Sequence, residues 1–492
     1  MAYSTRIDIN MSLICRKRWN MSHFTRIGFI MIDHPWRNSM KKRSDRFISI
    51  QKRSSKIYIL IPAGILLAAA IVAGILYMTG FFYNKKDIQV SAEVSSEEMQ
   101  AAAAETKIVP ADMLSRTLSL LRDKTNTSPY VVSWCVLPGS VSSETGMQSE
   151  YLVAEDQALL LQYFVKSGNK DDARTLANAI EKDFAGEKGY LVPYRKVSEL
   201  VSMTGLVPVF PLHEDYDNLP PDTEYSMEAT VGYLKGLLAY YARWGQASDL
   251  ERIERIADLL YTGDVSSSIF FEDLTINVAT PTPLPTGADQ DIVDVAEGEV
   301  STGGSFSTVA LASLDLDVFR MLGSLDSRYL PLYDMALAIL NEGLVSDSLP
   351  LYAVGYSQAS DGYVYYFGGK TAADLVSSLK VTLHLAEAGK VPVSTILWIK
   401  QHLYNDGALY ASYDLINGLA GEETAALEAY GLLLKIARVT DDADLYSKTM
   451  RRLEANLATN SSSPARNSIF RQVEGTRVAV YAGDNLAALL GV

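Results

Sequence analysis

Motifs for bound metals and phosphates are missing from this chain of 492 residues. Its only cysteines are Cys15 and Cys135, and no Cys-x-x-Cys pair occurs, which excludes a disulfide scaffold and the common zinc sites. The chain also lacks the His-Glu-x-x-His pattern of zinc proteases and the Gly-x-x-x-x-Gly-Lys-Ser/Thr pattern of phosphate-binding loops. We therefore expect neither a metal nor a cofactor.

Positive charge is scarce in most of the chain. The formal net charge is −14, and many of the Lys and Arg residues cluster near the N-terminus, as in Arg16-Lys17-Arg18 and Lys41-Lys42-Arg43. The remainder is strongly acidic. Because the phosphates of nucleic acids need a basic surface, we expect no nucleic-acid partner.

One long apolar run, Ile57 to Tyr83, contains no charged residue. A helix needs roughly 20 apolar residues to cross a bilayer, and aromatic residues such as Phe81 and Phe82 are typical of its interfaces. The run is too long for the core of a cleaved signal peptide, so we expect an uncleaved transmembrane helix. The positive-inside rule then predicts a cytoplasmic N-terminus and an extracellular remainder, in the cell membrane.

The run divides the chain into four parts. Residues 1–56 are expected to form a disordered, basic cytoplasmic tail, with Met40 as an alternative start of the chain. Residues 57–83 form the transmembrane helix. Residues 84–106 are rich in Ser, Glu and Ala, which predicts a linker or a juxtamembrane helix. Residues 107–492 are long enough for one large extracellular domain.

The large domain carries a helical pattern throughout. Apolar residues recur at spacings of three and four, as in Leu427, Tyr430, Leu433 and Leu434, and this spacing is typical of amphipathic helices. Turn signals such as Gly168 separate neighbouring helices into pairs. We expect twelve helices, at residues 111–123, 149–166, 170–184, 226–244, 248–261, 305–322, 328–341, 371–388, 391–403, 422–438, 441–457 and 482–490.

Helical hairpins without alternating strands argue against an α/β fold. An open solenoid should repeat with a fixed short period, whereas the spacings here are irregular and the inserts are long. The sequence therefore favours an all-α fold, an (α/α)6 toroid of helical hairpins.

Three inserts between helices are rich in tyrosine and β-like in pattern. They cover residues 189–194, 361–369 and 406–414, and they contain Tyr194, Tyr365 and Tyr413. Tyrosine has a flat apolar face and a polar tip, which suits a cleft for sugars. The alternative is that the inserts are short hairpins that pack on the ring. We predict that the three tyrosines contact substrate.

Three acidic residues are candidates for chemistry or binding at such a cleft. Glu144 follows the apolar segment 130–136, and partial desolvation there would raise its pKa toward that of a general acid. Glu228 is expected in the first turn of a helix, where the helix dipole favours an anion or where it serves in a capping box. Asp317 lies three residues before Arg320, so the two can form an ion pair on one helix face.

These segments together resemble the family-8 glycoside hydrolases. Ser143-Glu144-Thr145-Gly146-Met147 is similar to the family signature Ser-Glu-Gly-Gln-x-Tyr-Gly-Met, and Asp317-Val318-Phe319-Arg320 is similar to Asp-Ala-x-Arg. The segment from Ser226-Met227-Glu228 to Trp244-Gly245 resembles the family's Asp-Ala-Asp segment and the helix that follows it. The Gly-Gln of the first signature is Thr-Gly here, and the first Asp of Asp-Ala-Asp is Ser226.

The resemblance implies an (α/α)6 enzyme that cuts glycosidic bonds with inversion. Glu144 would be the general acid, and Asp317 the base that activates water. Glu228, Arg320 and Trp134 would bind sugars, together with the three insert tyrosines. The expected function is therefore a membrane-anchored extracellular hydrolase that cuts internal β-linked bonds of a polysaccharide, such as an exopolysaccharide or a β-1,4-glucan.

Two other functions remain open from the sequence. A catalytically impaired relative could bind the polysaccharide or associate with a polysaccharide synthase complex. A helical ring of this kind could also serve only as an interaction surface for a protein partner. A cleft without stacked aromatic residues would favour the last alternative.

Overall fold

The computed structural model describes residues 85–88, 90–91, 96–122, 129–137, 147–200, 225–261, 275–276, 306–357, 361–365, 372–473 and 477–492. The chain divides into two compact units, residues 1–78 and 79–492, and every described residue belongs to the second. The predicted transmembrane helix at 57–83 and the predicted general acid Glu144 lie outside the described residues. Among the described residues, no helix is both long and apolar enough to cross a membrane.

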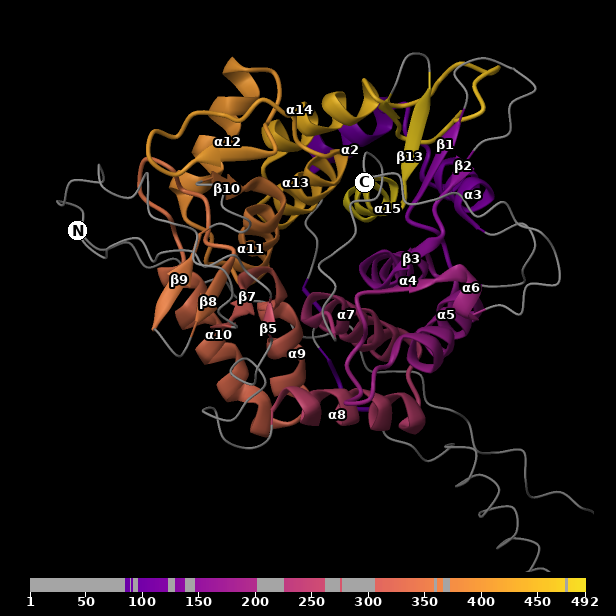
Figure 1. Cartoon of the computed structure of the whole chain (residues 1–492), viewed down its shortest axis with the longest axis vertical. Helices are drawn as coiled ribbons and strands as arrows, with labels where there is room; N and C mark the ends of the chain where they lie inside the picture. The colour runs from indigo at the N-terminus through magenta and orange to yellow at the C-terminus, as the bar shows by residue number, and fades with distance from the viewer. Residues whose placement is uncertain are drawn as a thin grey trace, which may run out of the picture. The chain divides into compact units, whose positions relative to one another are not determined.

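Six helices pack side by side into a closed ring around a common axis (Figure 1). Each contacts the next in chain order, and the last contacts the first. These inner helices are α4 (Ala154–Ser167), α7 (Met227–Trp244), α9 (Leu316–Leu325), α11 (Leu375–Glu387), α13 (Leu427–Val439) and α15 (Ala482–Gly491).

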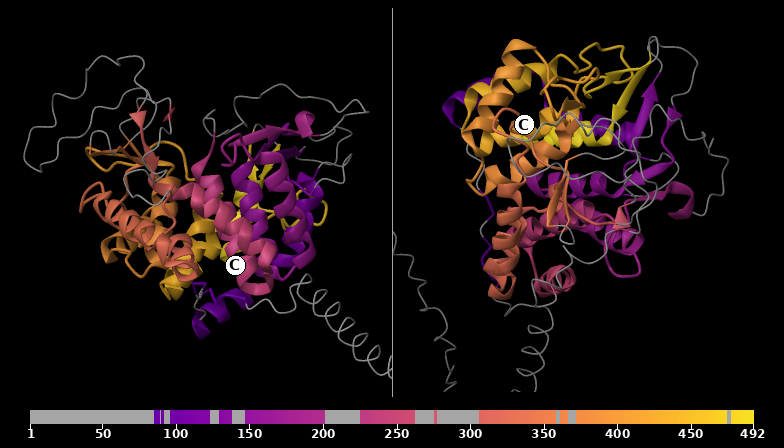
Figure 2. Two further views of the ribbon diagram at one scale, coloured as in Figure 1. Left: turned by 90° about the horizontal axis from the view of Figure 1, so that it is seen from below. Right: turned by 60° about the vertical axis from the view of Figure 1, so that its left-hand side comes forward.

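Six further helices complete the hairpins around the ring, and α3 packs against the last inner helix, α15 (Figure 2). They are amphipathic: α5, for example, buries Leu176, Ile180 and Phe184 and leaves its charged residues outside. The twelve predicted helices are thus present, and the predicted helical ring is confirmed. The outer helices are α3 (Pro110–Leu121), α5 (Lys170–Phe184), α8 (Ala247–Leu260), α10 (Leu330–Glu342), α12 (Val393–Asn405) and α14 (Ala443–Glu454).

The predicted starts of four inner helices, α4, α9, α11 and α13, were too early along the chain. Short extended segments come first, because their backbone groups bond to another segment instead of continuing the helix. Tyr151–Val153 (β3) pairs with Tyr194–Lys196 (β4), and Ala372–Asp374 (β10) pairs with Ser412–Asp414 (β11). The segment ahead of α9 forms β7 (Val309–Ala310), which pairs with β8 (Gly355–Ser357), and β8 pairs with β9 (Gly362–Val364).

A four-stranded antiparallel sheet joins the beginning and the end of the domain. Its strand order is β12, β13, β1, β2, and Trp134 of β1 lies opposite Tyr481 of β13. The remaining described elements are α6 (Val197–Leu200), two short 3₁₀ turns at 311–313 and 327–329, and strands β5 (Thr275–Ile276) and β6 (Phe306–Ser307). The strands of the sheet are β1 (Trp134–Leu137), β2 (Met147–Gln148), β12 (Arg471–Gln472) and β13 (Val478–Tyr481).

The segment predicted as a linker or juxtamembrane helix contains a helix, α2 (Glu97–Glu105). It packs against α14, and its Met99 is only 2% exposed within the core. Thr106 and Lys107 bond to the carboxylate of Glu454 at the end of α14. This part of the chain is therefore attached to the ring.

Candidate active site

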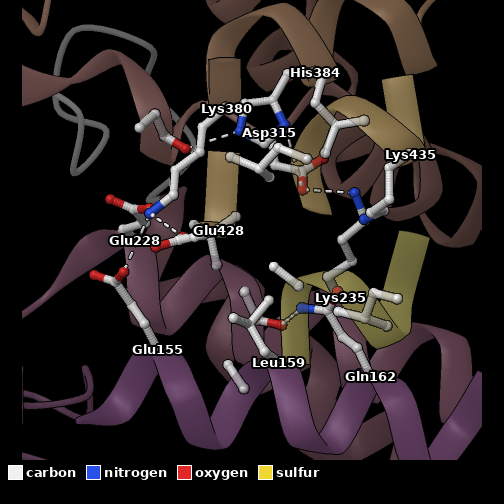
Figure 3. Close-up of a pocket in the computed structure, with 18 residues that line it drawn as sticks. Glu155, Leu159, Gln162, Glu228, Lys235, Asp315, Lys380, His384, Glu428 and Lys435 are labelled. Atoms are coloured by element: carbon white, nitrogen blue, oxygen red, sulfur yellow. Dashed lines mark hydrogen bonds and ion pairs between the residues drawn. The ribbon is translucent and has the colours of Figure 1, made fainter. Parts of the chain in front are cut away.

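Three inner helices place a glutamate in the first turn. They are Glu155 of α4, Glu228 of α7 and Glu428 of α13, and the positive end of a helix dipole favours an anion at this position. Because neighbouring helices of the ring begin at the same end, the three side chains converge. They line a cavity of about 100 Å³ on the ring axis (Figure 3).

A single lysine of α11 connects the three glutamates. The Lys380 ammonium lies 3.4 Å from Glu155 Oε2 and 3.6 Å from Glu428 Oε1, and it forms a closer ion pair with Glu228. All four side chains are largely shielded from solvent, with 19% of the lysine and 24–28% of the glutamates exposed. Three carboxyl groups therefore share one cation in a confined space.

This excess of negative charge favours a proton on Glu155. Burial raises the pKa of Glu155 to about 7, and the negative charges of Glu228 and Glu428 act in the same direction. The Lys380 ammonium opposes the rise only in part. Burial would lower the pKa of Lys380, but Glu228, Glu155 and Glu428 outweigh it and hold that pKa well above its usual range. The lysine thus stays charged, and Glu155 can hold a proton near neutral pH.

Asp315 lies further along the same cavity in the opposite protonation state. Its Oδ1 atom caps α9 by accepting hydrogen bonds from the N–H groups of Asp317 (3.0 Å) and Val318 (3.1 Å). Its Oδ2 atom accepts a hydrogen bond from Lys235 Nζ at 2.9 Å. Burial would raise its pKa, but Lys235 and then His384 outweigh it and hold the pKa of Asp315 below its usual range. Asp315 is therefore a carboxylate at neutral pH.

Asp315, His384 and Glu387 also bring three potential metal-ligand atoms within 4.8 Å of one another. The Lys235 ammonium lies among them, 2.9 Å from Asp315 and 2.7 Å from Glu387. Burial would lower the pKa of Lys235, but the charges of Asp315 and Glu387 raise it above its usual range. The lysine already supplies the positive charge that a metal ion would bring to these carboxylates, so the residues fit an ion pair better than a metal site.

A further buried carboxyl group supports the glutamate cluster from behind. Asp156 is only 8% exposed, and burial, followed by the charges of Glu428 and Glu155, holds its pKa well above the usual range. A Cβ atom at Gly483 would lie 3.3 Å from Asp156 Oδ1 and 3.6 Å from Glu428 Oε2. The two carboxyl groups therefore approach each other over a glycine, where no side chain separates them.

The structure does not bring Asp317 to this cavity. Its side chain is 2% exposed, forms an ion pair with Arg320, and accepts a hydrogen bond from Ser91 Oγ at 2.6 Å. Asp317 lines a separate cavity of about 540 Å³ instead, where Gln162 and Lys235 are among the residues shared with the first. The sequence predicted Asp317 as the base and Arg320 as a sugar contact; in the structure the two side chains pair with each other and bind Ser91.

The predicted aromatic contacts divide into two groups. Trp134 and Tyr413 are 4% and 0% exposed, so neither ring has a face available to a sugar, and these two expectations are corrected because both are core residues. Tyr194 and Tyr365 are half-buried and line neither cavity. Tyr194 packs edge-on against Tyr151 with ring centroids 5.5 Å apart. In the described residues, the inserts form short strands that pack on the ring.

Glu155 was missed in the sequence, although a signal was present. The signature compared above has a glutamine two residues after its glutamate. Glu144 is followed by Thr-Gly, whereas Glu155 is followed by Asp156-Gln157. The side-chain amide of Gln157 bonds to both backbone groups of Val131, which fixes the start of α4 against the core. The glutamine two residues after Glu155 is the sequence feature that indicates the position of this glutamate at the cavity.

Comparison with known proteins agrees with this architecture. No protein-family model matches the chain, and no curated protein resembles it with statistical significance. Among solved structures, an alpha-amylase from Clostridium perfringens covers 79% of this chain and 98% of its own, with a TM-score of 0.56 and 20% identity. A beta-1,3-1,4-glucanase from Paenibacillus sp. X4 covers 82% and 95%, with a TM-score of 0.51 and 12% identity.

Many further solved structures match. One is an endoglucanase of glycosyl hydrolase family 8 from Klebsiella pneumoniae, which covers 70% of this chain and 97% of its own, with a TM-score of 0.43 and 11% identity. The chain therefore shares the helical fold of the alpha-amylase and the beta-1,3-1,4-glucanase. At these identities the likeness concerns the fold alone.

Proposed function

We propose that this protein is a glycoside hydrolase that cuts internal bonds of a polysaccharide, with Glu155 as general acid and Asp315 as general base. One observation carries the proposal: two carboxyl groups that line one axial cavity are held in opposite protonation states. Pairs of titratable groups whose environments separate their pKa values are typical of acid and base partners.

Glu155 suits the acid role because its proton is retained close to neutral pH. A pKa of about 7 keeps a useful fraction protonated there, and general acids work best when their pKa lies near the operating pH. The proton would pass from the Glu155 carboxyl to the glycosidic oxygen as the bond to the anomeric carbon breaks. Glu228 and Glu428 lie within reach of the same lysine and would accept hydrogen bonds from sugar hydroxyls.

Asp315 suits the base role because it is ionised and its orientation is fixed. The cap of α9 and the Lys235 ion pair hold its two oxygens. In an inverting enzyme a water lies between the base and the anomeric carbon, so the two carboxyl groups are typically about 6.5–9.5 Å apart. Asp315 would take a proton from that water as the new bond forms. We propose inversion, which the family resemblance implies, with Asp315 in place of the predicted Asp317.

The substrate and the location are further parts of the proposal. We propose a β-linked polysaccharide outside the cell, cut by a domain that the apolar run 57–83 anchors in the membrane, with a cytoplasmic N-terminus. A polysaccharide synthase complex is a proposed partner. The competing function is a catalytically impaired relative that binds the polysaccharide without cutting it. It would use the same cavity, so a binding measurement alone does not separate the two.

The test uses the full-length protein in detergent, with reducing ends measured after incubation with several polysaccharides. The panel contains β-1,4-glucan, mixed-linkage β-glucan, xylan, chitosan, a native exopolysaccharide and, because of the amylase fold, starch. We expect release from at least one β-linked polymer and its loss in Glu155→Gln, which keeps the size of the side chain. Binding without release, unchanged by the substitution, would replace this proposal with the non-catalytic one. Release from starch alone would overturn the β linkage.

A further inference from the structure

The two cavities follow one another along the ring axis, and Gln162, Lys235, Lys435 and Leu490 line both. Along α4, the residues that line the first cavity begin at Glu155, and those that line the second end at Lys166. Along α13 the corresponding residues run from Glu428 to Val439. Eleven residues of helix span about 16 Å. The candidate active site is thus at the end where the inner helices begin, and the larger cavity is at the end where they finish.

Residues 85–91 are bound at the far end. Lys85 Nζ donates a hydrogen bond to the carbonyl of Ala242, and the backbone N–H of Lys86 donates to Tyr241 Oη at 3.0 Å. Lys86 Nζ donates to the carbonyl of Leu325 at 3.2 Å. These acceptors belong to the last turns of α7 and α9.

The same segment continues along the opening of the larger cavity. Ile88, Val90 and Ser91 line it, and Ser91 Oγ bonds to Asp317 at 2.6 Å while accepting a hydrogen bond from Arg320 at 3.0 Å. Residues 85, 86 and 91 are therefore bound to α7 and α9 through several independent contacts. These contacts fix the point at which the chain enters the ring.

Charges of both signs are exposed at this end of the ring: Asp87, Asp171 and Asp172 lie there, and Lys86 forms an ion pair with Glu254. Lys85, Lys86, Lys166 and Arg243 are all exposed there. Lys166 and Arg243 bond to the terminal carbonyls of α15 and α4, where a cation offsets the negative end of the helix dipole. Basic side chains next to a membrane each attract anionic lipids by about 1 kcal/mol.

We propose that the end of the ring that binds residues 85–91 rests on the lipid headgroups of a bilayer, so that the candidate active site opens away from the membrane. The uncharged run 57–83 ends two residues before Lys85. A chain that leaves a bilayer at Tyr83 and is bound to the ring at Lys85 and Lys86 has little length in which to turn the ring over, since each extended residue spans at most about 3.6 Å. The opening would then be accessible to polymer from the side away from the membrane.

The inference rests on the membrane anchoring proposed above, and the test separates the two. Full-length protein carrying Cys15→Ser is reconstituted into vesicles of phosphatidylcholine and phosphatidylglycerol. A single labelling cysteine is introduced at Ser248, in the first turn of α8, or at Glu187, beyond the end of α5. Both positions are exposed, and Cys135 is buried. The two positions lie at opposite ends of the hairpins, so they report on the two ends of the ring.

Energy transfer from each label to an acceptor on the lipid headgroups is then measured. We expect the protein to float with the vesicles and transfer from position 248 to be severalfold greater than from position 187. Protein that does not float would overturn the anchoring. Floating protein with equal transfer, or with greater transfer from position 187, would overturn the orientation alone.

A second variant tests the contacts that hold the segment. Lys86→Ala combined with Ser91→Ala removes side-chain bonds to Leu325 and Asp317, and we expect it to float normally with the difference between the two labels reduced at least twofold. A matched control, Lys448→Ala, removes an exposed ion pair with Asp444 elsewhere on the surface and should leave the difference unchanged. If the double variant kept the full difference, the segment would not determine the orientation.

Discussion

Asp315 and Asp317 are separated by one residue, yet they line two different, adjoining cavities on the ring axis. Asp315 precedes α9 as its N-cap and is paired with Lys235 of α7. Asp317 lies in the first turn and is paired with Arg320 and Ser91. The start of α9 at Leu316, later than predicted, separates the two side chains. Only Asp315 therefore shares a cavity with Glu155.

This arrangement predicts different effects of two matched substitutions. Asp315→Asn retains a capping side chain but removes the proposed base, so kcat should fall by about 10²–10⁴-fold, the range typical of one acid–base group. Asp317→Asn should change kcat by less than about threefold, and it should lower the free energy of unfolding by about 1–3 kcal/mol because a buried charge-assisted bond is weakened. Reducing-end assays and urea unfolding of both variants check this. Equal loss of kcat in the two would contradict the assignment of the base.

The protonation of Glu155 predicts how the rate depends on pH. A general acid must be protonated, so activity should be retained below the pKa of Glu155 and decline as pH rises through about 7. Asp315 must be ionised, and its lowered pKa leaves it ionised throughout this interval. A series of kcat values across the neutral range, with substrate saturating, measures the decline. A decline that persisted at the same pH in Glu155→Gln, in whatever residual activity that variant has, would assign it to another group.

Lys380 should stabilise the glutamate cluster, and it should also determine the pH at which kcat declines. Lys380→Met leaves three partly buried carboxyl groups without their shared cation, and removing one partner of a buried ion pair costs about 3–5 kcal/mol. Without the lysine the pKa of Glu155 should rise, since Lys380 lowers it, and the decline should move to higher pH. Lys448→Met, which removes an exposed pair with Asp444, is the control and should cost at most about 1 kcal/mol. If kcat of a folded Lys380→Met protein declined at the same pH as that of the wild type, the lysine would not determine the pKa of Glu155.

The ring itself could be predicted from the sequence because each helix carries its own periodic signal. The apolar spacing in α13, for example, is enough to predict a helix whatever lies beside it. Several helix starts could not be predicted, since residues such as Tyr151–Val153 are apolar and continue the pattern by composition. Their extended state depends on pairing with Tyr194–Lys196, more than forty residues later in the chain, which no local pattern contains.

The site was less predictable, because its chemistry depends on which carboxyl groups meet. Glu228 was predicted from its place in a first turn, and it lines the cavity. Glu155 and Glu428 are equally first-turn residues, but their convergence on Lys380 depends on the ring closing. Tyr413 illustrates the converse error, because an aromatic residue in a polar insert looked accessible and is fully buried.

Gly483 provides a test of the pair formed by Asp156 and Glu428. In Gly483→Ala the new methyl group would lie 3.3 Å from Asp156 Oδ1, closer than side chains ordinarily tolerate, so one carboxyl group must move. Because Glu428 lies beside the proposed acid on Lys380, we expect kcat to fall by about tenfold, with a loss of stability of about 1–3 kcal/mol typical of overpacking. The measurements are kcat and urea unfolding of the purified full-length protein.

The matched control for this test is Gly232→Ala in α7, which lines the same cavity. There a Cβ atom would lie 3.5 Å from the Cβ of Ala158, an ordinary contact, and alanine favours a helix by about 1 kcal/mol over glycine. This variant should therefore be as stable as the wild type or more stable, with kcat within about threefold. If both variants lost activity alike, the cavity would be sensitive to any added atom. If neither did, the close approach of Asp156 and Glu428 to Gly483 would have no part in positioning the glutamates.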